Sequence, residues 1–470
     1  MSTAYDLVVI GAGPGGYVAA ARAAALGLKT ALVEKDDALG GTCLHRGCIP
    51  TKALLHAADL YGEMRQARHI GIEAEGVRVD WRKVQRSKQR IVDTNAGGVR
   101  HLMSTRGVDV HQGFGMLDGP GRVRVRSGKE KKAATLATRN VLLAVGSTPR
   151  ALPMASFDHP SGRVVGSDGI LRLGEIPGSL VIIGGGVIGV EFASLFVRFG
   201  AQVTVLEAAE RLLPAADADC SLQLQRQLAK QGVRIHTGAR VGDISPRKQG
   251  VTVGFTDAGG KQLTCEGDIV LVAVGRAPLT QGIGLEQTQA RVDDRGYVRV
   301  NGWMQTEQDG LYAIGDCVET PWLAHVASAE GIIAVEQMAG RQPAALNYDH
   351  IPSCVYSDPP VAQCGLTQQQ AAEAGHDVKT SVFPFARSGK ASILGKKEGF
   401  VKFVTEARYG EILGVHIIGP QATELIAEPA FAMQLEATVE DIARSVHAHP
   451  TLYESIYEAA AIAADRAIHG

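Results

Sequence analysis

The sequence predicts an α/β protein with two similar parallel-sheet domains and a C-terminal α+β domain. Near the start, a glycine-rich turn stands between a strand-like run and an Ala-rich helix. The same turn recurs at a constant offset of 173 residues, from Gly11 to Gly184. From Ile351 onward, alternating strand patterns are followed by helical ones. A chain of 470 residues has room for three domains of about 150 residues each, which agrees with this division.

Composition narrows the classes of function. The formal net charge is −1, which gives no electrostatic footprint for nucleic acid or an anionic membrane. The most apolar long run, 180–197, is broken by glycines and carries Glu191, so it predicts a strand and a helix and not a membrane span. The first strand begins almost at Met1, which leaves no room for a leader and predicts a cytoplasmic chain or an already trimmed organellar one. The seven cysteines lack metal-ligand spacing, and we expect no metal site.

The first glycine turn predicts a dinucleotide site. Residues 5–10 (YDLVVI) are expected to form a buried parallel strand, 15–26 a helix and 30–33 the next strand. Glycines permit a tight turn and close backbone approach, the helix N-terminus attracts a pyrophosphate, and an acid after the second strand accepts hydrogen bonds from a ribose. The residues predicted to bind this dinucleotide are Gly11, Gly13, Gly16 and Glu34.

The second turn repeats the first, with 180–183 and 203–206 as its predicted strands. The matching residues are Gly184, Gly186, Gly189 and Glu207. The alternative is that only one of the two units binds a dinucleotide and that the other is an inherited Rossmann unit that binds none. Two sites imply two dinucleotides, and a flavin with a nicotinamide is the economical pair, although the glycines do not say which is which.

The chemistry is expected in residues 40–52 (GGTCLHRGCIPTK). On a regular helix Cys43 and Cys48 would lie about 140° apart around the axis and about 7.5 Å apart along it, too far for a disulfide. Gly47 and Pro50 give reasons for a distorted helix. A strained disulfide is easily reduced and tends to be catalytic or regulatory. Two reduced, buried cysteines are the other reading, and the spacing alone does not choose between them.

Three further segments bear on the sites. Similar apolar strands leave the two paired domains, 141–146 ending at Gly146 and 269–278 passing through Gly275. Asp316 follows another apolar strand and could bind a ribityl or ribose hydroxyl, or simply cap a turn. The predicted domain ranges are 1–149 and 150–277 for the two dinucleotide units, 278–349 for a segment that completes the first site, and 350–470 for the α+β domain.

The tail carries a histidine and a carboxylate five residues apart, His449 and Glu454, with His447 close by. Histidine is the natural base for a thiol near neutral pH, and a carboxylate on its second nitrogen would fix the tautomer. Taken alone, this segment is better explained as a surface histidine cluster.

Together these residues resemble one family. From DLVVIGAGPGGYVAA through GGTCLHRGCIPTK, VIIGGGVIGVEFASLF and LYAIGD to HAHPTLYE, the chain is similar over essentially its whole length to the flavin-dependent pyridine nucleotide-disulfide oxidoreductases. Within that family it resembles the branch that oxidises dihydrolipoyl groups.

The resemblance implies FAD at the first turn and NAD at the second. A carboxylate at Glu207 accepts the free ribose 2′-hydroxyl of NAD and repels a 2′-phosphate. Gly146, Asp316 and Ala324 would complete the FAD set, and Gly275 the NAD set.

The resemblance also implies roles for the redox residues. Cys43 would meet the substrate, and Cys48 would face the flavin and form the charge-transfer pair. His449 would be the base, oriented by Glu454, and would reach the disulfide from the other subunit. A homodimer through the third domain is therefore expected.

Lys52 would lie near the reactive flavin nitrogen, paired with Glu191. The implied reaction oxidises a dihydrolipoyl group and reduces NAD. Because no lipoyl-type domain precedes the first strand, the implied partners are lipoyl-bearing subunits of 2-oxo acid dehydrogenase or glycine cleavage complexes.

Two departures from the family pattern bear on the substrate. His45-Arg46 replaces the more usual Asn-Val, which brings a cation that could lower a thiol pKa or alter access, and residues 357–360 (SDPP) replace Thr-x-Pro-Glu. The alternatives are another disulfide reductase of this architecture, acting on glutathione or another low-molecular-weight thiol, and a non-catalytic flavoprotein that serves as a scaffold or redox sensor. Glu207 counts against the NADPH-using reductases.

Overall fold

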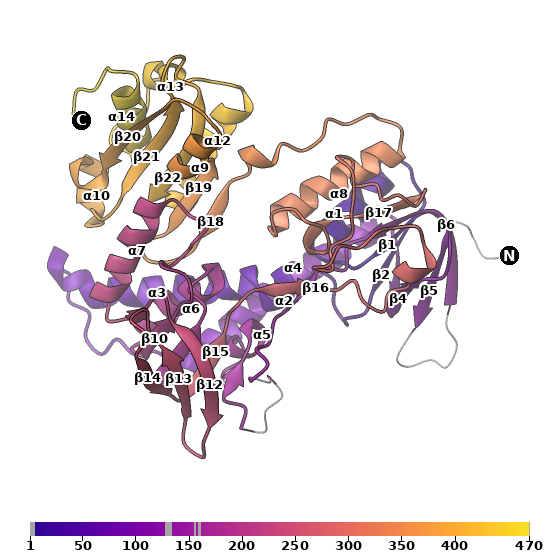
Figure 1. The fold of residues 1–470 in the computed structure, drawn as a ribbon, viewed down its shortest axis with the longest axis horizontal. Coiled ribbons are helices and arrows are strands. Elements are labelled where there is room, and N and C mark those ends of the chain that lie inside the picture. Colours follow the sequence, from indigo (N-terminus) through magenta and orange to yellow (C-terminus); the bar gives the residue numbers. More distant parts are fainter. Residues whose placement is uncertain (1–4, 127–133, 155–156, 158–160, 470) are drawn as a thin grey trace. The chain divides into compact units, whose positions relative to one another are not determined.

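The computed structural model describes residues 5–126, 134–154, 157 and 161–469. Two units make up the chain (Figure 1). Unit 1 comprises Met1–Leu54, Arg82–Arg150 and Gly275–Tyr348. Unit 2 comprises Leu55–Trp81, Ala151–Val274 and Asp349–Gly470. The four predicted domain ranges divide the chain differently and stay a prediction.

Unit 1 is built on a seven-stranded sheet with the order β3-β2-β1-β6-β5-β4, in which β17 also pairs with β6. The strands β1, β2, β3, β6 and β17 are joined by parallel pairing, whereas β4, β5 and β6 pair antiparallel. Side chains of β1 are buried on both faces, as its continuous apolar run predicts. The strands are β1 (Tyr5–Ile10), β2 (Thr30–Glu34), β3 (Asp109–Gln112), β4 (Phe114–Leu117), β5 (Arg122–Arg126), β6 (Ala134–Leu143) and β17 (Leu311–Ala313).

Helices α1 and α8 pack against each other at close range in unit 1. A Cβ atom added to Gly331 would lie 2.8 Å from the carbonyl oxygen of Gly15, so the two backbones touch where neither residue has a side chain. The other elements of this unit are short, apart from α4. The bounds are α1 (Pro14–Ala25), α2 (Gly41–Arg46), α3 (Cys48–Gln66, which continues into unit 2), η1 (Ala67–Ile70, in unit 2), α4 (Trp81–Thr105), β7 (Ser147–Pro149), β16 (Arg276–Pro278), η2 (Leu285–Gln287), η3 (Gly315–Cys317), α8 (Ala324–Met338) and η4 (Tyr348–His350).

The first sheet of unit 2 has the order β11-β10-β9-β15-β8, and all its pairings are parallel. Its first four strands repeat the order β3-β2-β1-β6 of unit 1. A separate antiparallel sheet, β12-β13-β14, follows in the chain. The bounds are β8 (Val164–Val165), α5 (Ser167–Ile170), β9 (Ser179–Ile183), α6 (Val187–Arg198), β10 (Gln202–Leu206), α7 (Ala218–Lys230), β11 (Arg234–His236), β12 (Arg240–Pro246), β13 (Val251–Thr256), β14 (Gln262–Gly267) and β15 (Ile269–Val272).

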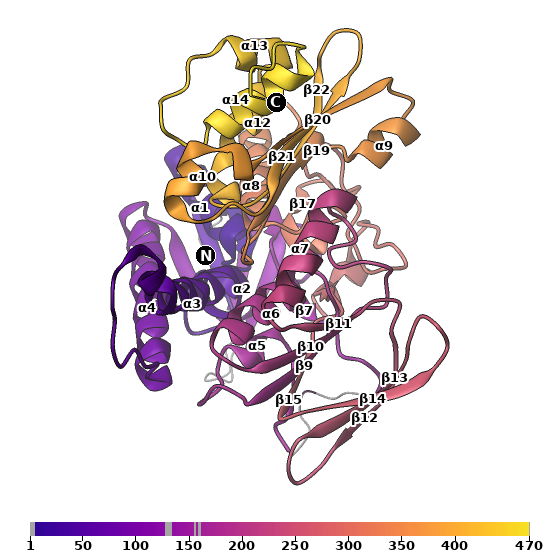
Figure 2. The ribbon, with the colours of Figure 1, turned by 90° about the vertical axis from the view of Figure 1, so that its left-hand side faces the viewer.

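The C-terminal part of unit 2 is an α+β sandwich around the antiparallel sheet β18-β19-β22-β21-β20. Helix α14 packs on β20 and β21, and Figure 2 shows α13 and α14 together beside this sheet. Their apolar side chains form one core with those of β21 and β22. The bounds are β18 (Ser353–Val355), β19 (Val361–Gly365), α9 (Gln368–Glu373), β20 (Val378–Pro384), η5 (Phe385–Arg387), α10 (Gly389–Leu394), β21 (Phe400–Glu406), β22 (Ile412–Ile418), α11 (Ala422–Leu425), α12 (Ala427–Gln434), α13 (Val439–Arg444) and α14 (Glu454–Ala463).

The predicted strand 269–278 is wrong as a single element. It consists of β15 and β16, which belong to different sheets. Gly275 separates them with φ of +106°, a conformation that an extended strand cannot contain. Its carbonyl oxygen accepts the N–H of Arg150 at 3.0 Å. Among the described residues, none of the helices combines the length and the apolar character needed to cross a membrane.

Candidate functional site

The first glycine turn has the geometry that a dinucleotide phosphate requires. Gly11 has φ of +101°, and a Cβ atom there would lie 2.3 Å from the carbonyl oxygen of Ala144. A Cβ atom at Gly16 would lie 1.9 Å from the carbonyl oxygen of Gly11, so only glycine fits both positions. A Cβ atom at Gly13 would meet nothing within 4 Å. The turn is therefore closed on the protein side and open above the N-terminus of α1, where a pyrophosphate binds.

The second turn has the same geometry at the N-terminus of α6. Gly184 has φ of +107°, and its Cβ atom would lie 2.4 Å from the carbonyl oxygen of Ala273. A Cβ atom at Gly189 would lie 1.9 Å from the carbonyl oxygen of Gly184, and one at Gly186 would again meet nothing within 4 Å. The repeat seen in the sequence is thus a repeat in backbone shape.

The two predicted ribose acids also occupy equivalent places. Glu34 accepts the N–H of Ala12, inside the turn, at 2.7 Å and the N–H of Asp36 at 2.9 Å. Glu207 accepts the N–H of Gly185 and, at 2.6 Å, the N–H of Ala209. A carboxylate offers about four lone-pair directions, so each acid retains capacity for ribose hydroxyls. The open space at the turns and these acids fit the adenosine and pyrophosphate parts of FAD and NAD.

The two redox cysteines are separated by a break in the helix, as the sequence predicts. Helix α2 ends at Arg46, Gly47 adopts φ −143° and ψ −112°, and α3 begins at Cys48. The side chains of Cys43 and Cys48 are hydrogen-bonded to each other as free thiols. This hydrogen bond and burial raise the pKa of the Cys43 thiol far above its ordinary value. The pair is therefore close enough for exchange chemistry.

Pro50 has a different role from the one expected. Because α2 has already ended, Pro50 lies in the first turn of α3, where its missing N–H leaves no hydrogen bond unmade. The carbonyl oxygen of Gly47 accepts the N–H of Thr51 at 3.1 Å and its hydroxyl at 2.6 Å. Gly47, and not Pro50, is the point of distortion.

Asp316 lies on η3 within a polar cluster of unit 1. The Ser147 hydroxyl donates to its carboxylate, and Arg276 donates through Nε to Ser147 Oγ at 2.7 Å. Arg276 Nε lies 4.0 Å from Asp316 Oδ2. Gly146, with φ of +71°, directly precedes Ser147, and Ala324 is the first residue of α8. The FAD residues predicted around this strand end thus lie in the same unit as the first turn.

Sequence reasoning missed Glu330 in this region. Its side chain is fully buried in α8 and accepts the N–H of Gly315 at 2.7 Å and the hydroxyl of Tyr348 at 2.9 Å. Burial raises the pKa of the Glu330 carboxyl. A carboxylate in the apolar helix sequence AHVASAEGIIAVEQM is the signal that could have found it. Glu330 holds the backbone that carries Asp316.

The predicted roles of Lys52, Glu191 and Gly275 are not tested by the structure. Lys52 lies on α3, one turn beyond Cys48. Glu191 is buried on α6 and accepts the N–H of Tyr356 at 3.1 Å. Gly275 belongs to unit 1, whereas the other predicted NAD residues belong to unit 2. The Lys52–Glu191 ion pair and the NAD role of Gly275 stay predictions.

The histidine segment distinguishes its two candidates for the base. His449 Nδ1 lies 2.8 Å from Glu454 Oε1, and the ring is 79% exposed. His447 has both ring nitrogens next to acceptors, Nε2 at 2.7 Å from Glu428 and Nδ1 at 3.1 Å from the carbonyl oxygen of Ser445. The ring of His447 is held between two acceptors, whereas the ring of His449 is exposed and bound through Nδ1 to a carboxylate, which makes His449 the better candidate for the base.

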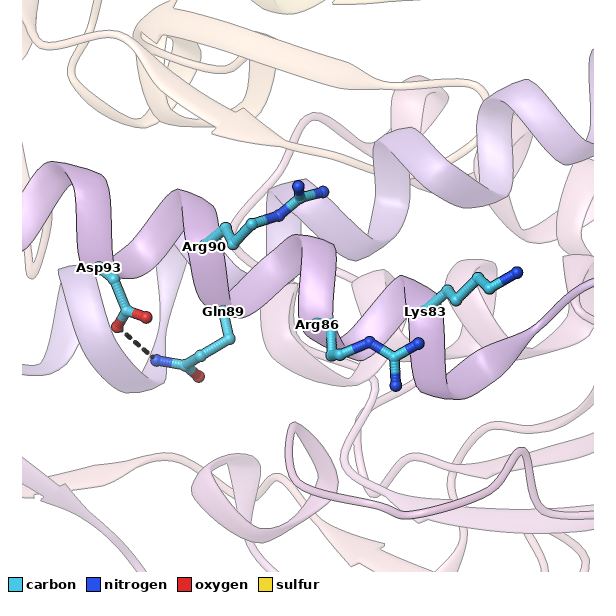
Figure 3. Close-up of a pocket in the computed structure, with 5 residues that line it drawn as sticks. All are labelled: Lys83, Arg86, Gln89, Arg90 and Asp93. Atoms are coloured by element: carbon cyan, nitrogen blue, oxygen red, sulfur yellow. Dashed lines mark hydrogen bonds between the residues drawn. The ribbon is translucent and has the colours of Figure 1, made fainter.

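Helix α4 carries a basic face outside the predicted sites. Figure 3 shows a hollow lined by five of its side chains, and Gln89 Nε2 donates to Asp93 Oδ1 at 2.9 Å. The lining residues are Lys83, Arg86, Gln89, Arg90 and Asp93.

Comparison with known proteins decides the family. Residues 5–331 match the family described as pyridine nucleotide-disulphide oxidoreductase, and residues 351–460 match its dimerisation domain. The chain belongs to the pyridine nucleotide-disulphide oxidoreductases. This confirms the resemblance and the predicted fold class, two dinucleotide-binding domains with a C-terminal dimerisation domain. Members of this family use FAD and NAD, and the dimerisation domain supports a homodimer.

The proteins similar to this oxidoreductase include a dihydrolipoyl dehydrogenase and a disulfide reductase. The chain is 45% identical to a dihydrolipoyl dehydrogenase of Bacillus subtilis over 477 residues, which covers 100% of both chains. Among solved structures it is similar to LpdA from Mycobacterium tuberculosis, with a TM-score of 0.89, 29% identity and coverage of 97% of this chain and 98% of the other. It is also similar to the HOCl-induced flavoprotein disulfide reductase RclA from Escherichia coli, with a TM-score of 0.87, 28% identity and coverage of 98% and 99%.

Proposed function

We propose that this oxidoreductase oxidises protein-bound dihydrolipoyl groups to lipoyl groups and reduces NAD to NADH. The observation that carries the proposal is the hydrogen-bonded pair Cys43 and Cys48, held across the break at Gly47 in the unit that also contains the first glycine turn. Full-length similarity to dihydrolipoyl dehydrogenases supports the substrate class.

The thiol steps follow from the chemistry of exchange. His449, with Nδ1–H donated to Glu454, takes a proton from one substrate thiol at Nε2. The substrate thiolate attacks Cys43 Sγ, the Cys43–Cys48 bond breaks, and Cys48 leaves as a thiolate. The second substrate thiol then displaces Cys43 from the mixed disulfide, which releases the lipoyl group and leaves the enzyme as a dithiol. One substrate dithiol is oxidised as one enzyme disulfide is reduced.

The hydrogen bond to Cys48 and burial raise the pKa of the Cys43 thiol. Cys48 is proposed to face the cofactor and to act there as the thiolate. The chemistry that bound FAD supplies is acceptance of the electron pair and its transfer to NAD as a hydride.

The cofactor residues are assigned by the two turns. FAD is proposed to lie over Gly11, Gly13 and Gly16, with its ribose on Glu34, and NAD over the second turn with its ribose on Glu207. The open space at Gly13 and Gly186 supports both placements. Gly146, Asp316, Ala324, Lys52 and Gly275 complete the proposed cofactor residues.

The proposed partners are lipoyl-bearing subunits of 2-oxo acid dehydrogenase or glycine cleavage complexes. The names of the relatives support a dihydrolipoyl substrate, and His449 from the second subunit of the homodimer would complete each site. The cytoplasmic location stays a prediction.

An anaerobic assay tests the proposal against the other disulfide reductases. Dihydrolipoamide with NAD should give NADH, whereas glutathione disulfide should give little turnover with NADPH or NADH. The same preparation should carry about one flavin per chain. Turnover only with glutathione disulfide and NADPH would move the protein to another branch of the family, and bound flavin without any thiol turnover would favour the scaffold or sensor alternative.

A further inference from the structure

The short linker 35–41 leads from β2 to the segment that carries Cys43 and Cys48, and it packs directly against the first glycine turn. The N–H of Gly40 donates to the carbonyl oxygen of Ala12 at 2.9 Å. A Cβ atom at Gly41 would lie 2.6 Å from Gly13 Cα, so the linker passes against the glycine turn itself. Leu39 is buried in the core between them. The start of α2 is thus fixed to the backbone where the dinucleotide is expected.

The two residues between the cysteines, His45 and Arg46, bind back to the same linker. Arg46 Nη2 donates to Asp36 Oδ2 at 2.7 Å, and His45 Nε2 lies 2.8 Å from the carbonyl oxygen of Leu39. A carbonyl only accepts, so His45 donates from Nε2. The end of α2 is therefore also fastened to the linker, and the fastening uses the residues that depart from the family's usual Asn-Val.

The contacts continue to the predicted FAD ribose acid. The N–H of Asp36 donates to Glu34 Oε1 at 2.9 Å, and Glu34 Oε2 accepts the N–H of Ala12 at 2.7 Å. An unbroken chain of bonded residues thus runs from Arg46 through Asp36 and Glu34 to Ala12. Hydrogen bonds to charged groups are stronger than neutral ones, and three of these links involve a carboxylate.

The second glycine turn provides an internal comparison. There Ala209 occupies the position of Asp36 and donates its N–H to Glu207 in the same way. An alanine side chain cannot accept a hydrogen bond, so the chain of contacts ends at this residue. The extension from the ribose acid through Asp36 to Arg46 belongs to the first turn, which is the one followed by the redox cysteines.

We propose that Arg46 and His45 are positioning residues that fasten the Cys43–Cys48 turn to the acid of the FAD site, so that FAD binding and cysteine alignment are coupled. This inference rests on the proposed function, since it takes FAD as the ligand of the first turn. The role proposed for Arg46 is therefore one of positioning. Lys52 is the cation that lowers the pKa of Cys43 against the larger effects of Cys48 and burial.

The variant Arg46→Val removes the ion pair and restores a residue type usual in the family, so it is expected to fold. FAD should dissociate about three to ten times more readily, in line with the loss of one charged hydrogen bond. The long-wavelength charge-transfer absorbance per bound flavin should fall on anaerobic two-electron reduction, while KM for dihydrolipoamide stays unchanged. Asp36→Asn should have the same effects, and Arg46→Lys should restore part of the loss.

Two comparisons make the experiment specific. The double variant R46V/D36N should be no weaker in FAD binding than either single variant, because both remove the same link. Arg124→Val is the matched control, since Arg124 also forms a partly exposed ion pair in unit 1, with Asp118, but far from the linker in the chain. It should leave FAD affinity and the absorbance band as in the wild type.

The outcomes that overturn the inference are distinct from those that overturn the proposed function. Wild-type FAD affinity and absorbance in R46V, with a changed KM, would make Arg46 a substrate-contacting residue. If the losses of FAD affinity in the two single variants add up in R46V/D36N, Arg46 and Asp36 act separately. In either case the wild type remains an active flavoprotein, whereas a wild type that binds no FAD would contradict both proposals.

Discussion

The two glycine turns have nearly the same shape and different surroundings. Gly11 and Gly184 differ by 6° in φ (+101° and +107°), and the third glycine of each turn has the same 1.9 Å clearance to the carbonyl oxygen of the first. The connections that follow differ. After β2 the chain passes through residues 35–108, which contain α2, α3, η1 and α4, before it forms β3. After β10, residues 207–233 contain only α7 before β11.

This difference shows that the chemistry depends on the connection after the glycine turn, and not on the turn itself. The turn provides a general dinucleotide site because its recognition uses backbone N–H groups and one acid. The redox function is carried by the longer connection, which returns to the first turn through Gly40, Asp36 and Arg46. The second turn has equivalents of the first two contacts, because the Leu213 N–H donates to the carbonyl oxygen of Gly185 at 2.9 Å and the Ala209 N–H donates to Glu207 at 2.6 Å. The alanine side chain cannot continue these contacts as Asp36 does, and the dinucleotide at this turn is proposed to receive the electrons.

The largest expected effects come from the glycines that exclude a Cβ atom. Gly16→Ala should yield protein without flavin and without any turnover, because 1.9 Å is too close for two nonbonded atoms. Gly189→Ala should remain yellow and be reduced by dihydrolipoamide, but should lose NADH formation by at least about 100-fold, the effect of misplacing a bound reactant by about 1 Å. Bound flavin and the two half-reactions are measured separately.

Gly13→Ala and Gly186→Ala are the matched controls, since an added Cβ meets nothing there. Both variants should have the same Tm as the wild type and should lose only affinity for their dinucleotide. If Gly189→Ala also lost its flavin, the two turns would not serve separate dinucleotides.

The next largest effect separates the thiol chemistry from both turns. His449→Gln should lower thiol-dependent turnover about 100- to 10,000-fold, the usual contribution of a positioned general base. Reduction of an artificial dye by NADH should stay near the wild-type rate, because it needs no thiol base. His447→Gln should lower thiol-dependent turnover less than His449→Gln does, since His447 is bound to Glu428 and Ser445. It should also leave dye reduction near the wild-type rate. Equal losses in the two assays would remove His449 from the base role.

A smaller effect is expected from the paired acids. Glu34→Gln should lower FAD affinity about tenfold, and Glu207→Gln should raise KM for NAD by a similar factor, because each carboxylate loses one charged hydrogen bond. Glu207→Gln should also narrow the preference for NAD over NADP. Binding titrations with each dinucleotide check both effects, and an unchanged preference would assign the 2′-hydroxyl to another residue.

The smallest effect concerns the His449–Glu454 pair and pH. Burial raises the pKa of Glu454, but hydrogen bonds from the His449 ring and the Thr451 N–H outweigh it, so the pKa lies below its ordinary value of 4.5. The stabilisation is therefore present above pH 4.5 and is lost as pH falls through the lowered value. Glu454→Gln should reduce Tm by at most about 2 °C at pH 6 to 8, with a smaller difference in more acidic buffer. A Tm difference between Glu454→Gln and the wild type that becomes larger at lower pH would contradict the lowered pKa of Glu454.

Local patterns allowed much of this fold to be predicted. The strands β1 and β22, both glycine turns and the helix break near Gly47 follow from residues close together in the chain. The position of Gly275 was misjudged because a single residue with positive φ ends a strand that otherwise looks continuous.

The polar contacts of the site were harder to predict. Ser147 and Arg276 are 129 positions apart, and Arg46 reaches Asp36 across a linker whose path depends on contacts of Gly40 and Gly41 with the first glycine turn. The resemblance already favoured His449 over His447, and the structure adds the partners that support this choice. Side-chain pairing between distant segments has no periodic signal in the sequence, so it had to come from the structure.

The most direct test of the central claim is the absorbance of two serine variants as purified and kept oxidised under anaerobic conditions. The account places Cys48 on the flavin side and Cys43 on the substrate side of the pair attached to the first turn. Cys43→Ser should therefore show the long-wavelength charge-transfer band without added reductant, because its remaining Cys48 thiolate faces the flavin. Cys48→Ser should lack the band, and the opposite assignment of the band to these variants would contradict the account.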